Sequence, residues 1–153
     1  MIYIREDMNG FMSYDKYFQY LESKKNEMKP DIYAFASDPS RHDLSSRGSL
    51  HDAWLDSIFF RAKNYIYNDI EAQPDLTLNL LGPFHDRVHV LKYFEIKDCK
   101  LTNFDFFGNA READLLYHEV RQENNLVEHE IVFDREIVIE ITCASMRHAE
   151  RLL

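Results

Sequence analysis

The stretch LLYHEVRQENNLVEHEIVF, residues 115–133, carries the clearest structural signal in the chain. Its two halves, residues 115–120 and 127–133, are rich in β-branched, aromatic and other large apolar side chains. Between them lies Asn124-Asn125, a pair that tolerates the left-handed backbone of a tight two-residue turn. The stretch therefore predicts an antiparallel β-hairpin.

This hairpin sets the relationship between two histidines. With a two-residue loop, Val120 faces His129 across the hairpin. His118 then faces Ile131, so both histidines lie on one face as diagonal neighbours, about 7–8 Å apart at the backbone. A three-residue loop would send them to opposite faces and end any shared role. We expect the same-face arrangement.

The segments outside the hairpin extend the same pattern. Alternation and β-branched or aromatic content predict further strands at residues 76–80, 88–96 and 137–141. The connections between strands fall at Gly82-Pro83, residues 134–136 and the long segment 99–113. Short connections between consecutive strands indicate an antiparallel meander, because parallel strands need long crossovers.

An amphipathic helix is predicted at residues 13–29. Its apolar side chains recur at the spacing of one helical face, at Tyr14, Tyr17, Phe18, Leu21 and Met28. Ser13 is positioned to cap its start and Pro30 to end it. Residues 31–35 predict a short helical turn, and an irregular loop follows to residue 49.

Together these segments predict one α+β domain over residues 1–153. An N-terminal helical and loop segment, residues 1–48, would cover one face of a twisted antiparallel β-sheet meander, residues 49–146. We expect roughly five to seven strands in that sheet. Residues 50–60 are ambiguous from local pattern: Ser49 to Asp52 suits a helix capping box, whereas Ile58, Phe59 and Phe60 favour a strand.

Composition limits the classes of function. The chain has 27 acidic and 18 basic residues and a net charge of −9, and its basic residues are scattered, which disfavours nucleic-acid binding. No apolar run approaches the roughly 18 residues of a membrane helix. The acidic N-terminus does not resemble a signal peptide, and Cys99 and Cys143 fit no metal spacing, so we expect a cytoplasmic protein with reduced thiols.

Histidine-carboxylate pairs are the most unusual chemical feature. Five of the seven histidines precede a carboxylate, whereas chance gives roughly one: His42-Asp43, His51-Asp52, His85-Asp86, His118-Glu119 and His129-Glu130. Two histidines with a glutamate from the hairpin would supply a metal-ligand set. The alternative, which we favour, is ordinary cross-strand polar contacts on a partly solvated face.

The remaining pairs have similar alternatives. His85 follows a predicted turn and is expected to be exposed, and about 13 Å of strand separates it from His89, so the two would not share an ion. His51-Asp52 would either bond backbone groups where a strand begins or line a cleft at its edge. The binding residues that the sequence suggests are His51, Asp52, His85, Asp86, His118, Glu119 and His129.

No catalytic motif is recognisable. The sequence lacks a nucleophile elbow, a P-loop, a G-x-G-x-x-G loop and a zinc-type cysteine pair. The His-Asp dipeptides occur also in HD-type phosphohydrolases, but that fold is helical throughout and the second half of this chain is rich in predicted strands. We therefore expect no cofactor and favour a non-enzymatic protein.

Three short segments carry a family resemblance: SLHDA at residues 49–53, LGPFHDR at 81–87 and DLLYHE at 114–119. They resemble small uncharacterised bacterial proteins with an LHDA or LHDS strand opener and a β-meander, some of which are labelled immunity proteins of polymorphic toxin systems. The resemblance covers about residues 49–142. It implies a strand over residues 50–60 and supplies no catalytic residues.

Two functions follow as expectations. The first is a non-enzymatic protein-interaction module, of immunity type, whose acidic surface binds a basic partner. Its acidic patch would draw on residues 105–136, including Asp114, Glu123, Glu128 and Glu130. The second is a small metal-binding protein or metal-dependent hydrolase that uses the histidine-carboxylate pairs.

Overall fold

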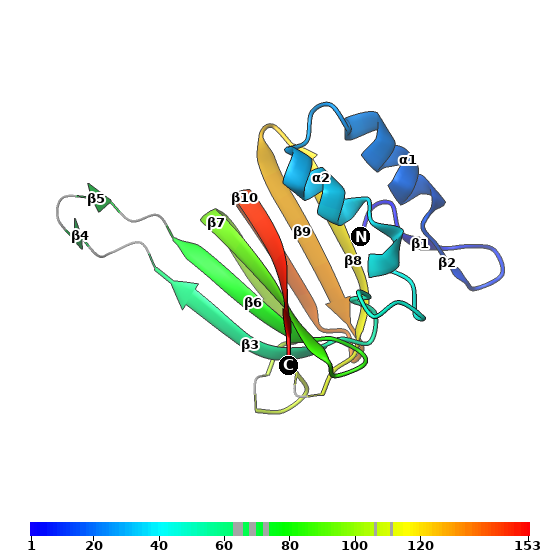
Figure 1. Ribbon diagram of the computed structural model, residues 1–153. Coiled ribbons are helices and arrows are strands. Elements are labelled where there is room, and N and C mark those ends of the chain that lie inside the picture. Colours follow the sequence, from blue (N-terminus) through cyan, green and yellow to red (C-terminus); the bar gives the residue numbers. More distant parts are fainter. Residues whose placement is uncertain (63–65, 68–69, 72–73, 106, 111) are drawn as a thin grey trace.

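The computed structural model describes residues 1–62, 66–67, 70–71, 74–105, 107–110 and 112–153. In this part of the chain two α-helices lie beside a six-stranded antiparallel sheet, which confirms the α+β class (Figure 1). The elements are β1 (Arg5–Glu6), β2 (Met12–Ser13), α1 (Asp15–Lys24), α2 (Pro30–Ala36), the 3-10 helix η1 (Pro39–Arg41), β3 (Trp54–Arg61), β4 (Ile66–Tyr67), β5 (Ile70–Glu71), β6 (Asp75–Leu81), β7 (Arg87–Thr102), β8 (Leu115–Glu123), β9 (Leu126–Phe133) and β10 (Val138–Leu152).

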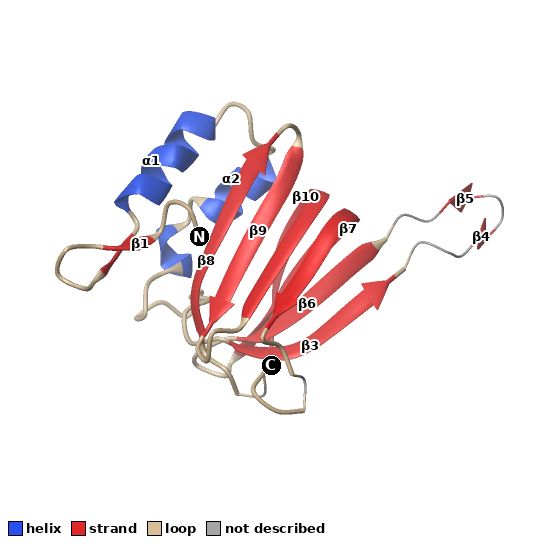
Figure 2. Ribbon diagram, turned by 180° about the vertical axis from the view of Figure 1, so that it is seen from behind, coloured by secondary structure: helices blue, strands red, loops and turns tan. Residues whose placement is uncertain are grey.

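The large sheet has the strand order β3-β6-β7-β10-β9-β8 (Figure 2). It therefore contains two three-stranded meanders, and the predicted single meander is wrong at one point. After β7 the chain does not form the neighbouring strand but crosses the end of the sheet to build its far edge, β8. The long connection predicted at residues 99–113 makes this crossing, although β7 itself continues to Thr102.

The β8–β9 hairpin has the predicted register. Asn124 and Asn125 both adopt positive φ, 50° and 63°, as a tight two-residue turn with the twist of a hairpin requires. Val120 pairs with His129 and His118 pairs with Ile131. The even loop thus places both histidines on the same face, as expected.

Strands β7 and β10 are much longer than predicted and form the centre of the sheet. They pair from Val138↔Thr102 to Leu152↔Arg87, with a bulge between Thr142 and Cys143. The predicted end of the sheet at residue 146 is therefore too early. Residues 147–152 lack the β-branched side chains that mark a strand, and they are extended because β7 offers a continuous pairing edge.

The N-terminal helices differ from prediction at their ends. Ser13 lies in β2 rather than capping α1, whose N-cap residue Tyr14 makes no side-chain capping bond. Pro30 does not end this helix but starts α2, at the first helical position, where its missing N–H is not needed. Within the described residues, neither helix is long and apolar enough to cross a membrane.

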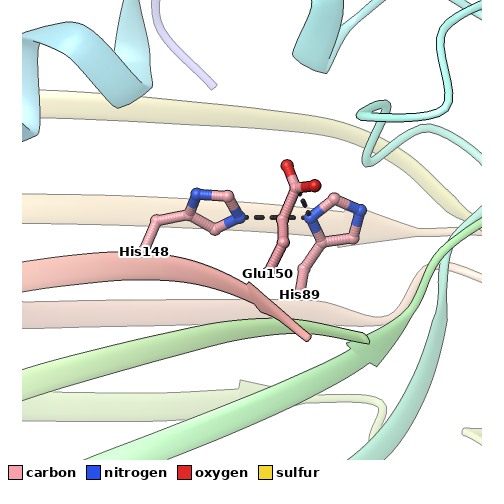
Figure 3. Close-up of side chains that lie close together, drawn as sticks. All are labelled: His89, His148 and Glu150. Carbon is pink, nitrogen blue, oxygen red and sulfur yellow. Dashed lines mark hydrogen bonds and ion pairs between the residues drawn. The ribbon is translucent and has the colours of Figure 1, made fainter. Parts of the chain in front are cut away.

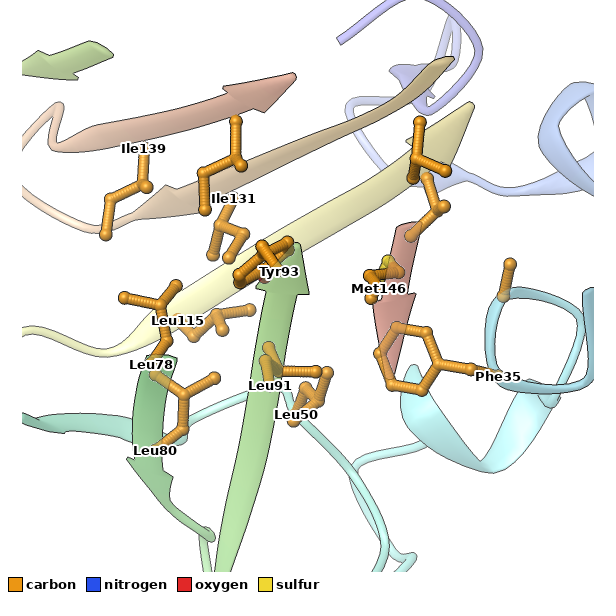
Figure 4. Packing of buried hydrophobic residues seen from close by; sticks show 14 of the residues in the cluster. Phe35, Leu50, Leu78, Leu80, Leu91, Tyr93, Leu115, Ile131, Ile139 and Met146 are labelled. Carbon is orange, nitrogen blue, oxygen red and sulfur yellow. The ribbon is translucent and has the colours of Figure 1, made fainter. Parts of the chain in front are cut away.

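Helix α2 contacts one face of the sheet, here called the inner face, and α1 contacts the edge strand β8; the opposite side is the outer face. Tyr17 of α1 bonds the backbone of Val120 in β8, and the ring of Phe35 of α2 lies 6.1 Å from that of His129 in β9. The core lies between these layers and includes Leu91, Tyr93, Ile131, Met146 and Phe35 (Figure 4). Residues 54–61 form β3, as the strand alternative for residues 50–60 predicted, but the strand begins only at Trp54.

Candidate functional site

Two of the predicted histidine-carboxylate pairs lie in turns at strand ends. His51 Nδ1 is 2.8 Å from Asp52 Oδ1, and the amide of Asp52 donates to the Leu115 carbonyl. His85 lies in the exposed turn between β6 and β7, as expected, with its ring 4.7 Å from that of Trp54. These contacts hold the turn that precedes β3 against its neighbours.

Asp86, which follows His85 in the sequence, also forms ion pairs at the surface. Asp86 forms ion pairs with Arg87, at 3.1 Å, and with Arg47. Hydrogen bonds from Arg87 and then Arg47 hold the pKa of Asp86 below its ordinary value. Asp86 is therefore a charged anchor for arginines.

His118 and His129 do meet, but inside the protein. His129 Nε2 lies 3.3 Å from His118 Nδ1, and His129 Nδ1 lies 2.8 Å from the Tyr93 hydroxyl. Both histidines are only 1% exposed, so the expected partly solvated face is wrong. Ile131 and Phe133 lie on the same face and are buried, because this is the inner face, which α2 contacts.

The glutamates that follow these histidines point to the other face of the sheet. Glu119 is fully buried, and it accepts hydrogen bonds from the backbone amides of residues 2–4 and from Arg121. Glu130 contacts Arg121 and the N-terminal amine of Met1. The ligand set proposed from two histidines and a neighbouring glutamate is therefore not assembled, since adjacent strand residues face opposite ways.

A layer of histidine and aromatic rings surrounds the His118–His129 contact. The His42 ring stacks on that of His118 at 4.5 Å, and the Phe35 ring contacts His118 and, at 4.8 Å, His148. Burial lowers the pKa of His42 to about 4 and that of His129 to about 3. Burial also lowers the pKa of His118 well below its ordinary value. These rings are therefore neutral at pH 7.

A second contact between histidines joins the two central strands. His89 of β7 and Glu150 of β10 are direct cross-strand partners, and His148 is two residues before Glu150 on the same face. His89 Nδ1 lies 3.1 Å from His148 Nε2 and 3.9 Å from Glu150 Oε1 (Figure 3). In the described part of the chain, this is the one group of three histidine, cysteine or acidic residues whose ligand atoms all lie within 4.8 Å of one another.

Two arginines hold the Glu150 carboxylate. Arg41 Nη1 donates to Oε1 and Arg87 Nη1 donates to Oε2, each at 2.6 Å. Burial alone would raise the pKa of Glu150, but these hydrogen bonds outweigh it and lower that pKa. Burial lowers the pKa of His89 and of His148 to about 4. The group thus combines a charged carboxylate with two neutral imidazoles.

Sequence reasoning missed this group for a definite reason. His148 and Glu150 are separated by one residue, which on a strand places them on the same face, whereas the two residues of an adjacent histidine-carboxylate pair lie on opposite faces. Their strand was predicted to end before them, so the spacing could not be used.

On the outer face, strands β7, β10, β9 and β8 form a depression of about 290 Å³. Its lining includes four carboxylates and two cationic side chains: Asp98, Glu128, Glu130, Glu140, Lys100 and Arg121. Glu128 and Glu130 belong to the predicted acidic patch. Asp114 instead accepts a hydrogen bond from the Trp54 ring, and Glu123 is exposed at the end of β8.

Comparison with known proteins adds little to this geometry. No protein-family model matches the sequence, and no curated protein matches it. A crystal structure of an uncharacterized protein from Neisseria gonorrhoeae is 20% identical, over 67% of this chain and 93% of that chain, with a TM-score of 0.43.

Proposed function

We propose that this protein is a non-enzymatic interaction module that binds a cationic segment of a partner protein at the outer-face depression. The observation that carries the proposal is the gathering of Asp98, Glu128, Glu130 and Glu140 around one hollow. Carboxylates that surround a concave surface raise the local concentration of a positively charged ligand and speed its encounter. The net charge of −9 acts in the same direction.

The depression is also prepared for a charged ligand. Arg121 contacts Glu119, Glu128 and Glu130 at 2.8–3.2 Å, and this network orders the side of the hollow that β8 and β9 form. The side chains of Glu128 and Glu140 are 40% and 46% exposed, and each also contacts a cationic side chain of this chain, Arg121 or Lys100, at 3.2 Å. An incoming arginine or lysine would meet carboxylates that are already ordered, which lowers the entropy cost of binding.

A second surface supports a role in association. On the inner face, Phe60 of β3 is 58% exposed and Leu101 of β7 is 42% exposed. Phe60 and Leu101 line an apolar hollow of about 380 Å³. Exposed apolar clusters of this kind often mark contacts with other proteins.

Binding of an octa-arginine peptide, measured by isothermal titration calorimetry, tests the charge argument. The double variant Glu128→Gln/Glu140→Gln should bind it roughly tenfold more weakly, since exposed charge contacts contribute up to about 1 kcal/mol each. The matched control is Glu22→Gln/Glu27→Gln, which removes two exposed charges from the region of α1. Binding should also weaken as salt rises past physiological strength, where screening acts over about 8 Å.

Equal loss of peptide binding in the two double variants would mean that only diffuse charge attracts the peptide, and the outer-face site would be rejected. The immunity-type role is a further step, which rests on the resemblance of residues 49–142 to proteins labelled as toxin immunity proteins. A gene for a basic toxin next to the gene for this protein would support that role. Failure of the chain to protect cells from the product of such a gene would oppose it.

A further inference from the structure

We propose that His89, His148 and Glu150 form a binding site for a divalent transition-metal ion of the zinc class. This inference goes beyond the proposed interaction and concerns the inner face of the sheet. Two imidazole nitrogens and a carboxylate oxygen converge within 4.8 Å from adjacent strands. The same set of donors, two histidines and one glutamate, holds zinc in sites that keep a fourth position open.

The spacing of the two rings fits a shared ion. Ligand nitrogens at about 2.1 Å from a tetrahedral zinc ion lie about 3.4 Å apart, and His89 Nδ1 lies 3.1 Å from His148 Nε2. In Figure 3 these two nitrogens face each other, and the Glu150 carboxylate lies beside the line that joins them. Small side-chain rotations would bring all three ligand atoms to bonding distance.

The protonation chemistry is also favourable. Two neutral rings whose nitrogens face each other share one hydrogen, which one ring donates and the other accepts. A metal ion takes the place of this hydrogen when the donating ring carries its proton on the other nitrogen instead. Each histidine then binds in its neutral form, as metal coordination requires, and no net proton release from the pair is needed.

The arginines position Glu150 without preventing coordination. A carboxylate offers about four lone-pair sites, and Arg41 and Arg87 use two of them. Each arginine also meets a second carboxylate, Asp38 or Asp86, so its charge is not directed at the site alone. Outer contacts that orient a ligand in this way strengthen metal binding.

The site has a route to solvent on the side of His148. This residue lines a cavity of about 410 Å³ together with Phe35, Arg41 and Arg147. His89, in contrast, is fully buried. A bound ion would thus have protein on one side and an exchangeable position, open to water or a small anion, on the other.

Zinc titration of tag-free, chelator-treated protein, followed by calorimetry and elemental analysis, tests the site directly. Wild-type protein should bind about one equivalent, and His148→Gln should weaken zinc binding at least tenfold, as expected for loss of a ligand. The matched control is His51→Gln, which alters a histidine that is 21% exposed and also contacts a carboxylate. This control should bind zinc as the wild type does.

A second measurement uses only the wild-type protein, so its result does not depend on whether a variant folds. Wild-type protein loaded with Co²⁺ and studied by X-ray absorption should show two imidazole ligands and no sulfur. Less than a tenth of an equivalent of zinc in the wild-type protein would overturn the proposal. Unchanged affinity in a folded His148→Gln variant, or a cobalt site without imidazole, would do the same.

Discussion

The hydroxyl of Tyr17 bonds both backbone groups of Val120. It accepts from the Val120 amide at 2.8 Å and lies 3.3 Å from the Val120 carbonyl oxygen, to which it donates. Tyr20, one turn along α1, makes the same pair of contacts with Gln122. Because β8 is an edge strand, these two hydroxyls take the place of a missing neighbour and leave less backbone available for pairing with another chain.

Replacement of Tyr17 by phenylalanine should therefore destabilise the protein. The change keeps the ring in the core but leaves the buried Val120 amide without its partner, which costs about 1–3 kcal/mol in the free energy of unfolding. Tyr33→Phe is the control, because its hydroxyl bonds the exposed Glu22 and its loss should change stability by less than about 0.5 kcal/mol. Urea denaturation of both variants measures the difference, and equal stability would contradict the edge role.

Stability should fall in mild acid because of the buried histidine layer. The pKa of His42 is about 4 and that of His129 about 3 in the folded protein, against about 6.5 in an unfolded chain. The unfolded state therefore binds protons first as the pH falls. The stability from these neutral rings is complete above about pH 7 and is lost progressively below about pH 6.5.

His42→Phe isolates one part of this effect. The His42 ring packs against Tyr14, Tyr17 and Phe18, so a phenyl ring suits its surroundings. Between pH 7 and pH 5 this variant should lose less free energy of unfolding than the wild type, by about 1–2 kcal/mol. Thermal or urea denaturation at the two pH values measures the difference. His85→Gln is the matched control for the removal of an exposed histidine. A His42→Phe profile that matches the wild type would exclude His42 as a contributor.

His118→Ala should lower the free energy of unfolding by clearly more than about 1 kcal/mol. Truncation of this 1% exposed ring leaves a cavity beside His42 and Phe35 and removes the contact with His129. Replacement of a solvated histidine by alanine would change the free energy of unfolding by less than about 1 kcal/mol. Denaturation at pH 7.5, where the ring is neutral, separates this packing effect from titration.

The sequence by itself was sufficient for features that depend on near neighbours. The Asn124-Asn125 turn and the alternation on each side of it determined the hairpin and its register, because turn geometry sets strand parity over a few residues. The helical face around Tyr17 and Leu21 was visible for the same reason. The ends of the helices were not, since Pro30 suits both the end of one helix and the start of the next.

Only the tertiary structure decided which strands meet and which faces are covered. The pairing of β7 with β10 extended the sheet through His148 and Glu150, residues whose local pattern does not favour a strand. Packing of Phe35 in α2 against the inner face buried His118 and His129, while the side chains of Glu119 and Glu130 point to the outer face. Both outcomes depend on contacts between residues far apart in the chain, so local sequence periodicity cannot predict them.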